Sequence, residues 1–193
     1  MPAIGNSSIR KNRLEFFSDA VLAVAITLMV LRINPPNIPA GQSEWQSFSN
    51  DVLPIIVYYL ITFAVIVRLW RRHHDIFWAL PNRVAPYQVT LNMMFLASVC
   101  LLPFGLEYYH STKPVSMFST AIYTVSMVVA IILLGVLGAS VTREIPWQAL
   151  SMSFIFLLAI PLVPWLGSWA IIVWVLTWPV GRWWDRHDNA ADG

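Results

Sequence analysis

The stretch RLEFFSDAVLAVAITLMVLRINPP, residues 13–36, begins with charged and polar side chains and then runs apolar until two prolines end it. Such a run is long enough for one membrane crossing, which takes about 20 helical residues. Its polar opening contains Arg13, Glu15, Ser18 and Asp19. An ionised carboxylate near the membrane boundary costs up to about 3 kcal/mol unless it is paired or hydrated. We therefore expect these polar side chains either to have partners in the folded protein or to take part in its function.

The composition of the chain indicates an integral membrane protein. Of its 193 residues, 58% are hydrophobic, only 11% are charged, and ten are tryptophans. A soluble domain of this size cannot bury so much apolar surface. The single Cys100 excludes a disulfide framework within the chain. A net charge of +2 gives no argument for a nucleic-acid partner.

Six segments of the sequence are long and apolar enough to span the hydrocarbon layer. They cover about residues 14–33, 51–70, 85–107, 117–140, 146–163 and 165–183. The first ends in an arginine and two prolines without a small-residue cleavage site, so we expect a retained helix and not a signal peptide. The last two are separated by Pro161 and Pro164. We expect an all-α membrane protein with one domain over residues 1–188, a tail at 189–193, and residues 73–87 along the membrane interface.

The basic residues are distributed unequally between the two sides of this arrangement. With the N-terminus in the cytoplasm, the outer side receives only Arg32 and Lys113. The inner side receives Arg10, Lys11, Arg13, Arg68, Arg71, Arg72, Arg83, Arg143, Arg182 and Arg186. Because Lys and Arg concentrate on the cytoplasmic side of membrane proteins, we expect an even number of crossings with both termini in the cytoplasm.

Motifs of the common enzyme and cofactor sites do not occur in the sequence. It contains no GxxxxGK[ST], GxGxxG, CxxC, HExxH or GxSxG pattern. The adjacent His73 and His74 are the only possible start of a metal site, but neighbours on a helix point about 100° apart and rarely bind one ion together. The sequence therefore predicts neither an enzyme nor a metal or cofactor site.

Two features of the first helix allow more than one interpretation. The inner end of the second helix lies at the membrane level of Asp19, so a buried polar clamp is possible there. Its members would be Arg13, Ser18, Asp19, His73 and Asn92, with Trp70 nearby. The alternative is that the polar residues of the first helix remain hydrated at the interface. Deeper in that helix, Val24, Thr27, Leu28 and Leu31 form one stripe at positions i, i+3, i+4 and i+7, a pattern that is usually a lipid or packing surface.

Three motifs, in order, resemble the transmembrane protein 175 family of potassium channels. The FSD of residues 17–19, preceded by Arg13, is similar to the signature of the family's first helix. The WxxHH of residues 70–74 is similar to its second helix, and the LN…LLPF of residues 91–104 to its third. The resemblance covers roughly residues 10–140.

The resemblance implies a six-helix subunit that assembles as a homotetramer and conducts K⁺ through a central pore lined by the first helices. It assigns Val24 to the narrowest layer, Leu28 and Leu31 to further apolar layers, and Thr27 to a hydroxyl ring. Members commonly carry Ile or Leu where this chain has Val24. The resemblance also implies K⁺ as the permeant ion, no cofactor, and a prokaryotic inner membrane.

The resemblance further implies a polar network that fixes the orientation of the first helix. Its members would be Arg13, Phe17, Ser18, Asp19, Trp70, His73 and Asn92. Other classes of function stay open. A weakly selective or proton-permeable channel would share this architecture, a proton-coupled transporter would use Asp19 and His73 as a relay, and a purely structural membrane subunit would conduct nothing.

Overall fold

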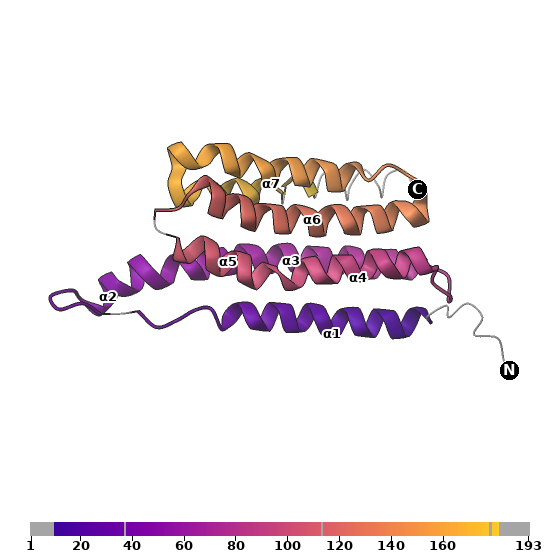
Figure 1. The fold of residues 1–193 in the computed structure, drawn as a ribbon, viewed down its shortest axis with the longest axis horizontal. Coiled ribbons are helices and arrows are strands. Elements are labelled where there is room, and N and C mark those ends of the chain that lie inside the picture. Colours follow the sequence, from indigo (N-terminus) through magenta and orange to yellow (C-terminus); the bar gives the residue numbers. More distant parts are fainter. Residues whose placement is uncertain (1–9, 37, 113, 178, 182–193) are drawn as a thin grey trace.

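The computed structural model describes residues 10–36, 38–112, 114–177 and 179–181, and it is helical in nearly all of them. Figure 1 shows the helices lying side by side in layers. The elements are α1 (Lys11–Val30), α2 (Glu44–Ser47), a π-helical turn (Phe48–Val52), α3 (Leu53–Ala79), α4 (Pro86–Cys100), α5 (Leu102–Ser111), α6 (Met117–Thr142), α7 (Trp147–Leu166) and a 3₁₀ helix (Gly167–Leu176). The all-α prediction is confirmed.

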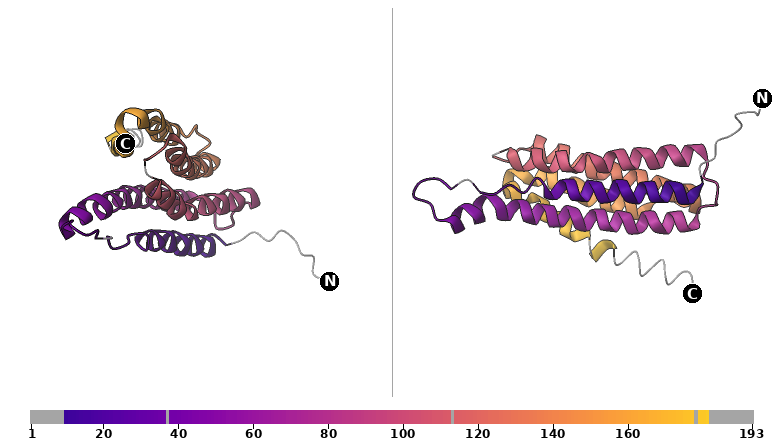
Figure 2. Two further views of the ribbon diagram at one scale, coloured as in Figure 1. Left: turned by 60° about the vertical axis from the view of Figure 1, so that its left-hand side comes forward. Right: turned by 90° about the horizontal axis from the view of Figure 1, so that it is seen from below.

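Helix α1 forms one outer layer of the bundle. It packs on α3, α4 and α5, and the right-hand view of Figure 2 shows it between α3 and the α4–α5 pair. Helices α6 and α7 form the layer on the other side, with α6 in contact with α3, α4 and α5 (Figure 1). One face of α1 is therefore covered by the bundle, and its opposite face has no neighbour within the described chain.

Four stretches of helix are long and apolar enough to cross a membrane. They are Glu44–Ala79, Pro86–Ser111, Met117–Thr142 and Trp147–Leu166. Helix α1 has a membrane-spanning length but carries Arg13, Glu15 and Asp19 in its first half, which makes it less apolar than these four. The apolar helix that follows α7, at Ile172–Gly181, is shorter. The described chain is thus a multi-pass membrane protein with four clear spans.

Several helix boundaries differ from the predicted ones. Helix α3 continues to Ala79, so residues 73–79 belong to it and do not lie as a separate interfacial stretch. No proline or glycine interrupts the chain between Pro54 and Pro81, and the helix ends where Pro81 prevents its continuation. The predicted third span is one helical run interrupted at Leu101, because Pro103 has no N–H to donate to the preceding turn.

The turn between the last two predicted spans also lies elsewhere. Pro161 and Pro164 lie inside α7, and the chain turns at Gly167, where φ is +55°. Neighbouring helices compensate for the hydrogen bonds that prolines remove within membranes, whereas a positive φ is easily adopted only by glycine. The predicted sixth span begins as the 3₁₀ helix from Gly167. Its end at residues 182–183 and the predicted tail at 189–193 lie outside the described residues.

A row of aromatic side chains connects the two sides of the bundle. Tyr58 of α3 contacts Tyr109 of α5 edge-on, with ring centroids 5.3 Å apart. Tyr109 contacts Tyr123 of α6, and Tyr123 contacts Trp174 at 5.1 Å. Trp174 reaches Phe156 of α7 at 4.9 Å. These buried rings bury large areas and have favourable pair geometries, so they fix α6 and α7 against the layer on which α1 lies.

Candidate functional site on helix α1

Helix α1 has a buried face and an exposed face. Every third or fourth residue is buried against α3, α4 and α5, namely Leu14, Ser18, Leu22, Ala25 and Met29. The stripe Val24, Thr27, Leu28 and Leu31 lies on the other side. Val24, Leu28 and Leu31 are 55%, 46% and 71% exposed within the single chain. A run of exposed apolar side chains of this length marks a surface that meets lipid or another protein.

The start of α1 is held by backbone contacts with the α3–α4 turn. The Lys11 N–H donates to the Asn82 carbonyl at 3.1 Å, and the Lys11 Nζ donates to the Leu80 carbonyl at 3.2 Å. Arg10 and Arg83 form an isolated antiparallel bridge. These contacts replace the side-chain cap that α1 lacks. They also show that the start of α1 and the end of α3 lie at the same end of the bundle.

A fully buried chain of hydrogen bonds connects α1 with α3 and α4. Asn92 Nδ2 donates to Ser18 Oγ at 2.9 Å, and Ser18 Oγ donates in turn to the Leu14 carbonyl at 2.8 Å. The Asn92 Oδ1 lies 2.9 Å from His73 Nε2, which therefore donates to it. Ser18, His73 and Asn92 have no exposed surface. Unpaired polar groups are costly in an apolar interior, so this chain determines how α1 is seated.

The His73 ring makes two aromatic contacts. It stacks on Phe77 with a centroid distance of 4.2 Å and on Phe95 at 5.8 Å. Within the described part of the chain, its Nδ1 has no hydrogen-bond partner. The ring is therefore positioned by stacking and by one hydrogen bond to Asn92.

A second set of contacts joins α1 to α3 nearer the surface. The Trp70 Nε1–H donates to Asp19 Oδ1 at 2.9 Å. Glu15 and His74 approach each other to 3.3 Å, and Trp70 stacks on His74. Because the two helices are antiparallel, the order of the contacts is reversed between them. Glu15, the earlier residue on α1, meets His74, the later residue on α3, and Asp19 meets Trp70. The result is a two-rung ladder made of Asp19–Trp70 and Glu15–His74.

The predicted polar set is thus divided into parts by the structure. Ser18, His73 and Asn92 form the buried chain, whereas Asp19 and Trp70 form one rung of the ladder. Arg13 and Phe17 are exposed, and Phe17 is 50% exposed. The pairing of Glu15 with His74 was not predicted. The equal spacing of four residues between Glu15 and Asp19 on one helix, and between Trp70 and His74 on the other, is the sequence signal that indicates it.

Groups that ligate metal ions do not gather at this site. Among the described residues, no cluster of three or more His, Cys, Asp or Glu side chains is arranged to hold a metal ion. What the site offers is an exposed apolar stripe, a hydroxyl at Thr27, and a polar network behind it. An exposed apolar stripe of this kind suits a surface along which something passes or docks.

The fold and the site define a multi-pass, all-helical membrane protein with one two-faced helix on its outside. The family described as "Endosomal/lysosomal potassium channel TMEM175" matches residues 13–103, which include α1 from Arg13 onward and all of α3 and α4. The chain belongs to this TMEM175 family.

Individual relatives are similar over different lengths. A "Potassium channel" of a Chryseobacterium species is 30% identical over 69% of this chain and 66% of its own length. The rat "Endosomal/lysosomal proton channel TMEM175" is 33% identical over 53% of this chain and 22% of its own. The crystal structure of a lysosomal potassium-selective channel TMEM175 homolog from Chamaesiphon minutus superposes with a TM-score of 0.70 at 27% identity, covering 86% of this chain and 94% of that one. The chain thus spans about two thirds of the bacterial relative and about a fifth of the animal one.

Proposed function

We propose that this chain is one subunit of a potassium channel in which four copies place α1 around a common axis. K⁺ would pass down its gradient through the space that the four helices enclose. The bacterial relative and the superposable crystal structure are both named as potassium channels. In this proposal Val24, Thr27, Leu28 and Leu31 line the pore, and the remaining helices support α1 from behind.

The observation that carries the proposal is the exposed stripe of α1. Lipid is the other environment that such a stripe suits, and two features of α1 favour a neighbouring subunit instead. Helix α1 is less apolar than the four clear spans and exposes the Thr27 hydroxyl. Ala20 and Ala23 are exposed beside the stripe, and small residues allow helices to approach closely in membranes.

The proposed mechanism depends on apolar rings and on one ring of hydroxyls. Rings of Val24, Leu28 and Leu31 would exclude water when narrow and admit a partly hydrated ion when the helices rotate or separate. The Thr27 Oγ1 donates its proton to the Val24 carbonyl at 2.8 Å. The lone pairs of that oxygen therefore remain available to a cation, and four of them would replace part of its hydration. The chain's own residues supply these ligands, and the proposal requires no cofactor.

The polar network would set the orientation of α1 and would not touch the ion. The buried chain through Asn92 and the two-rung ladder through Asp19 both attach to the face of α1 that lies away from Val24. A rotation of α1 about its axis would have to break these hydrogen bonds. The network therefore limits which residues can point to the pore.

The charges of the described residues suit a subunit with both termini in the cytoplasm. Arg68 and Arg72 of α3 lie beside the α6–α7 turn, at the end where Lys11 contacts the α3–α4 turn. Arg32 lies at the other end with Asp51 and His110. We assign the arginine-rich end to the cytoplasm. With α1 and the segment after Gly167 as further crossings, the subunit would have six, and the inner membrane of a prokaryotic cell is the proposed location.

The test is conduction by the purified full chain in liposomes or planar bilayers under K⁺ and Na⁺ gradients. We expect a reversal potential that follows the K⁺ gradient. Val24→Ala widens the proposed narrowest ring, so it should increase the current and lower the preference for K⁺. Val30→Ala is the matched control, because Val30 is 45% exposed on another side of α1. Equal currents from the two variants, or wild-type selectivity in Val24→Ala, would refute the pore assignment.

A proton-permeable channel is the second candidate, and it is favoured by the name of the rat relative as a proton channel. It would use the same α1 pore. In the same bilayers its reversal potential would follow a pH gradient and be indifferent to K⁺. A proton-coupled transporter would instead show saturable, pH-driven uptake without single-channel currents.

A further inference from the structure

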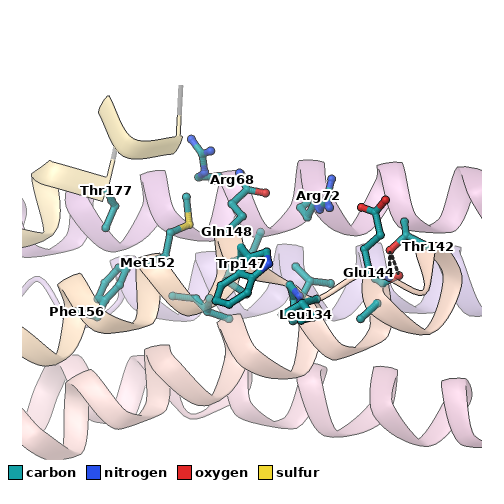
Figure 3. A pocket seen from close by; sticks show the side chains of 18 of the residues that line it. Arg68, Arg72, Leu134, Thr142, Glu144, Trp147, Gln148, Met152, Phe156 and Thr177 are labelled. Carbon is teal, nitrogen blue, oxygen red and sulfur yellow. Dashed lines mark hydrogen bonds between the residues drawn. The ribbon is translucent and has the colours of Figure 1, made fainter. Parts of the chain in front are cut away.

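A pocket of about 170 Å³ opens between α3 and the α6–α7 turn, away from the exposed face of α1. Figure 3 shows Arg68 and Arg72 along α3 on one side, with Trp147, Gln148 and Met152 of α7 facing them. Helix α6 supplies the floor through Leu134 and its neighbours. The pocket is a space between helices and is separate from the stripe to which conduction is assigned.

The lining of the pocket has a cationic part and an apolar part. Arg68 and Arg72 are four residues apart on α3, so they lie on one helix face. The apolar part extends from them along Val65, Met152 and Phe156. Arg68 is half-buried and lies directly against Gly181, where any Cβ would collide with its guanidinium. The absence of a side chain at Gly181 leaves room for that guanidinium beside the pocket.

One carboxylate also lines the pocket. Glu144 lies at its edge, exposed, and its backbone N–H donates to Thr142 Oγ1 at 3.4 Å. Within the described residues, no ion pair links Glu144 with Arg72. The charged side chains that line the pocket are thus two arginines and one glutamate.

We propose that this pocket binds an anionic phospholipid. The phosphate would lie between the guanidinium groups of Arg68 and Arg72, which match phosphate oxygens in geometry and charge. One acyl chain would follow Val65, Met152 and Phe156. A free anion would make no use of the apolar part, and an uncharged lipid would make no use of the arginines. Only a ligand with both a negative head and an apolar tail complements the whole pocket.

The level of the pocket in the membrane agrees with this ligand. It lies at the arginine-rich end of the bundle, beside the end of α6 and the start of α7. Trp147 at its rim is 57% exposed, and tryptophans concentrate at the depth of lipid headgroups. Basic pockets between membrane helices at this depth are suited to anionic headgroups. The proposal needs membrane insertion only and does not depend on K⁺ conduction.

The experiment measures lipid binding to the purified full chain in detergent by native mass spectrometry and by the lipid-dependent shift in thermal unfolding. The probes are phosphatidylglycerol, phosphatidylcholine and inorganic phosphate. We expect phosphatidylglycerol to bind and to raise the unfolding temperature, and the other two to do neither. Arg72→Gln should weaken phosphatidylglycerol binding about fivefold, and Arg68→Gln with Arg72→Gln more strongly. Glu144→Gln should strengthen it.

Arg71→Gln is the matched control, because Arg71 has the same charge on the same helix turn and does not line the pocket. It should bind phosphatidylglycerol as the wild type does. An equal loss in Arg71→Gln would show diffuse surface attraction and overturn the proposal. Equal binding of phosphatidylcholine, or an equal thermal shift from inorganic phosphate, would overturn it as well. Because Arg72 is exposed, its variant tests the proposal even if Arg68→Gln does not fold.

Discussion

Asn92→Leu is the substitution that tests most directly whether the buried chain seats α1. Asn92 makes two hydrogen bonds of 2.9 Å, one to Ser18 and one with His73, and is completely buried. Leucine has the same number of side-chain heavy atoms in the same branched arrangement but provides neither bond. Ser18 still donates to the Leu14 carbonyl, whereas His73 loses the partner of its Nε2 and has none at Nδ1 within the described residues.

The expected loss follows from these two partners. A hydrogen bond between membrane helices contributes about 0.6 kcal/mol on average. We take this value for the lost hydrogen bond from Asn92 to Ser18. Leaving a buried polar group without a partner costs about 1–3 kcal/mol, which is the cost for His73. Together they predict a loss of about 1.6–3.6 kcal/mol in the free energy of unfolding of Asn92→Leu.

The assay is reversible unfolding in mixed micelles with increasing denaturing detergent, followed by tryptophan fluorescence. Thr90→Ala is the control, since Thr90 lies on the same helix, is exposed and, within the described part of the chain, donates its hydroxyl to the Pro86 carbonyl alone. We expect it to change the free energy of unfolding by less than about 0.5 kcal/mol. A double-mutant cycle with Ser18→Ala should give a coupling between about 0.6 and 1.7 kcal/mol. An Asn92→Leu protein as stable as Thr90→Ala would refute the reasoning.

Three further substitutions test other contacts. Trp174→Ala empties the end of the aromatic row and should cost about 3–5 kcal/mol in thermal or detergent unfolding; an unchanged midpoint would show that the row does not hold the layers together. Gly105→Leu should reduce the yield of folded protein in gel filtration, since a Cβ there would lie 3.1 Å from Tyr123 Cδ2. Asp19→Asn removes the charge that accepts from the Trp70 Nε1–H. We expect it to weaken that bond by about 1 kcal/mol and to lower the fraction of chains that assemble into the proposed tetramer. Wild-type assembly and current would contradict this.

The sequence allowed the helical class and the contact of Ser18 with His73 and Asn92 to be anticipated, because both depend on general constraints. An apolar run must satisfy its backbone within itself, and polar residues at one membrane depth find each other. It did not reveal where chain direction changes. Pro161 and Pro164 look like helix ends in the sequence, but both lie inside α7, where neighbouring helices compensate for the missing hydrogen bonds. The chain turns at Gly167 instead.

Pairs that depend on the relative rotation of two helices were also harder to predict. Glu15 and His74 meet only because α1 and α3 are antiparallel and in a particular register. The predicted topology already makes these two helices antiparallel, but their register does not follow from it. The roles assigned to Val24, Thr27, Leu28 and Leu31 depend on what faces them from other chains, so they stay predictions until assembly and conduction are measured.

The unequal attachment of α1 along its length has a mechanical consequence. Its first half is fastened by directed hydrogen bonds through Ser18, Asp19 and Lys11. Its second half is held by apolar packing of Leu22, Ala25 and Met29. Between apolar surfaces in lipid there is little hydrophobic penalty for separation. If α1 tilts about its hydrogen-bonded first half, at the arginine-rich end, Leu28 and Leu31 are displaced more than Val24.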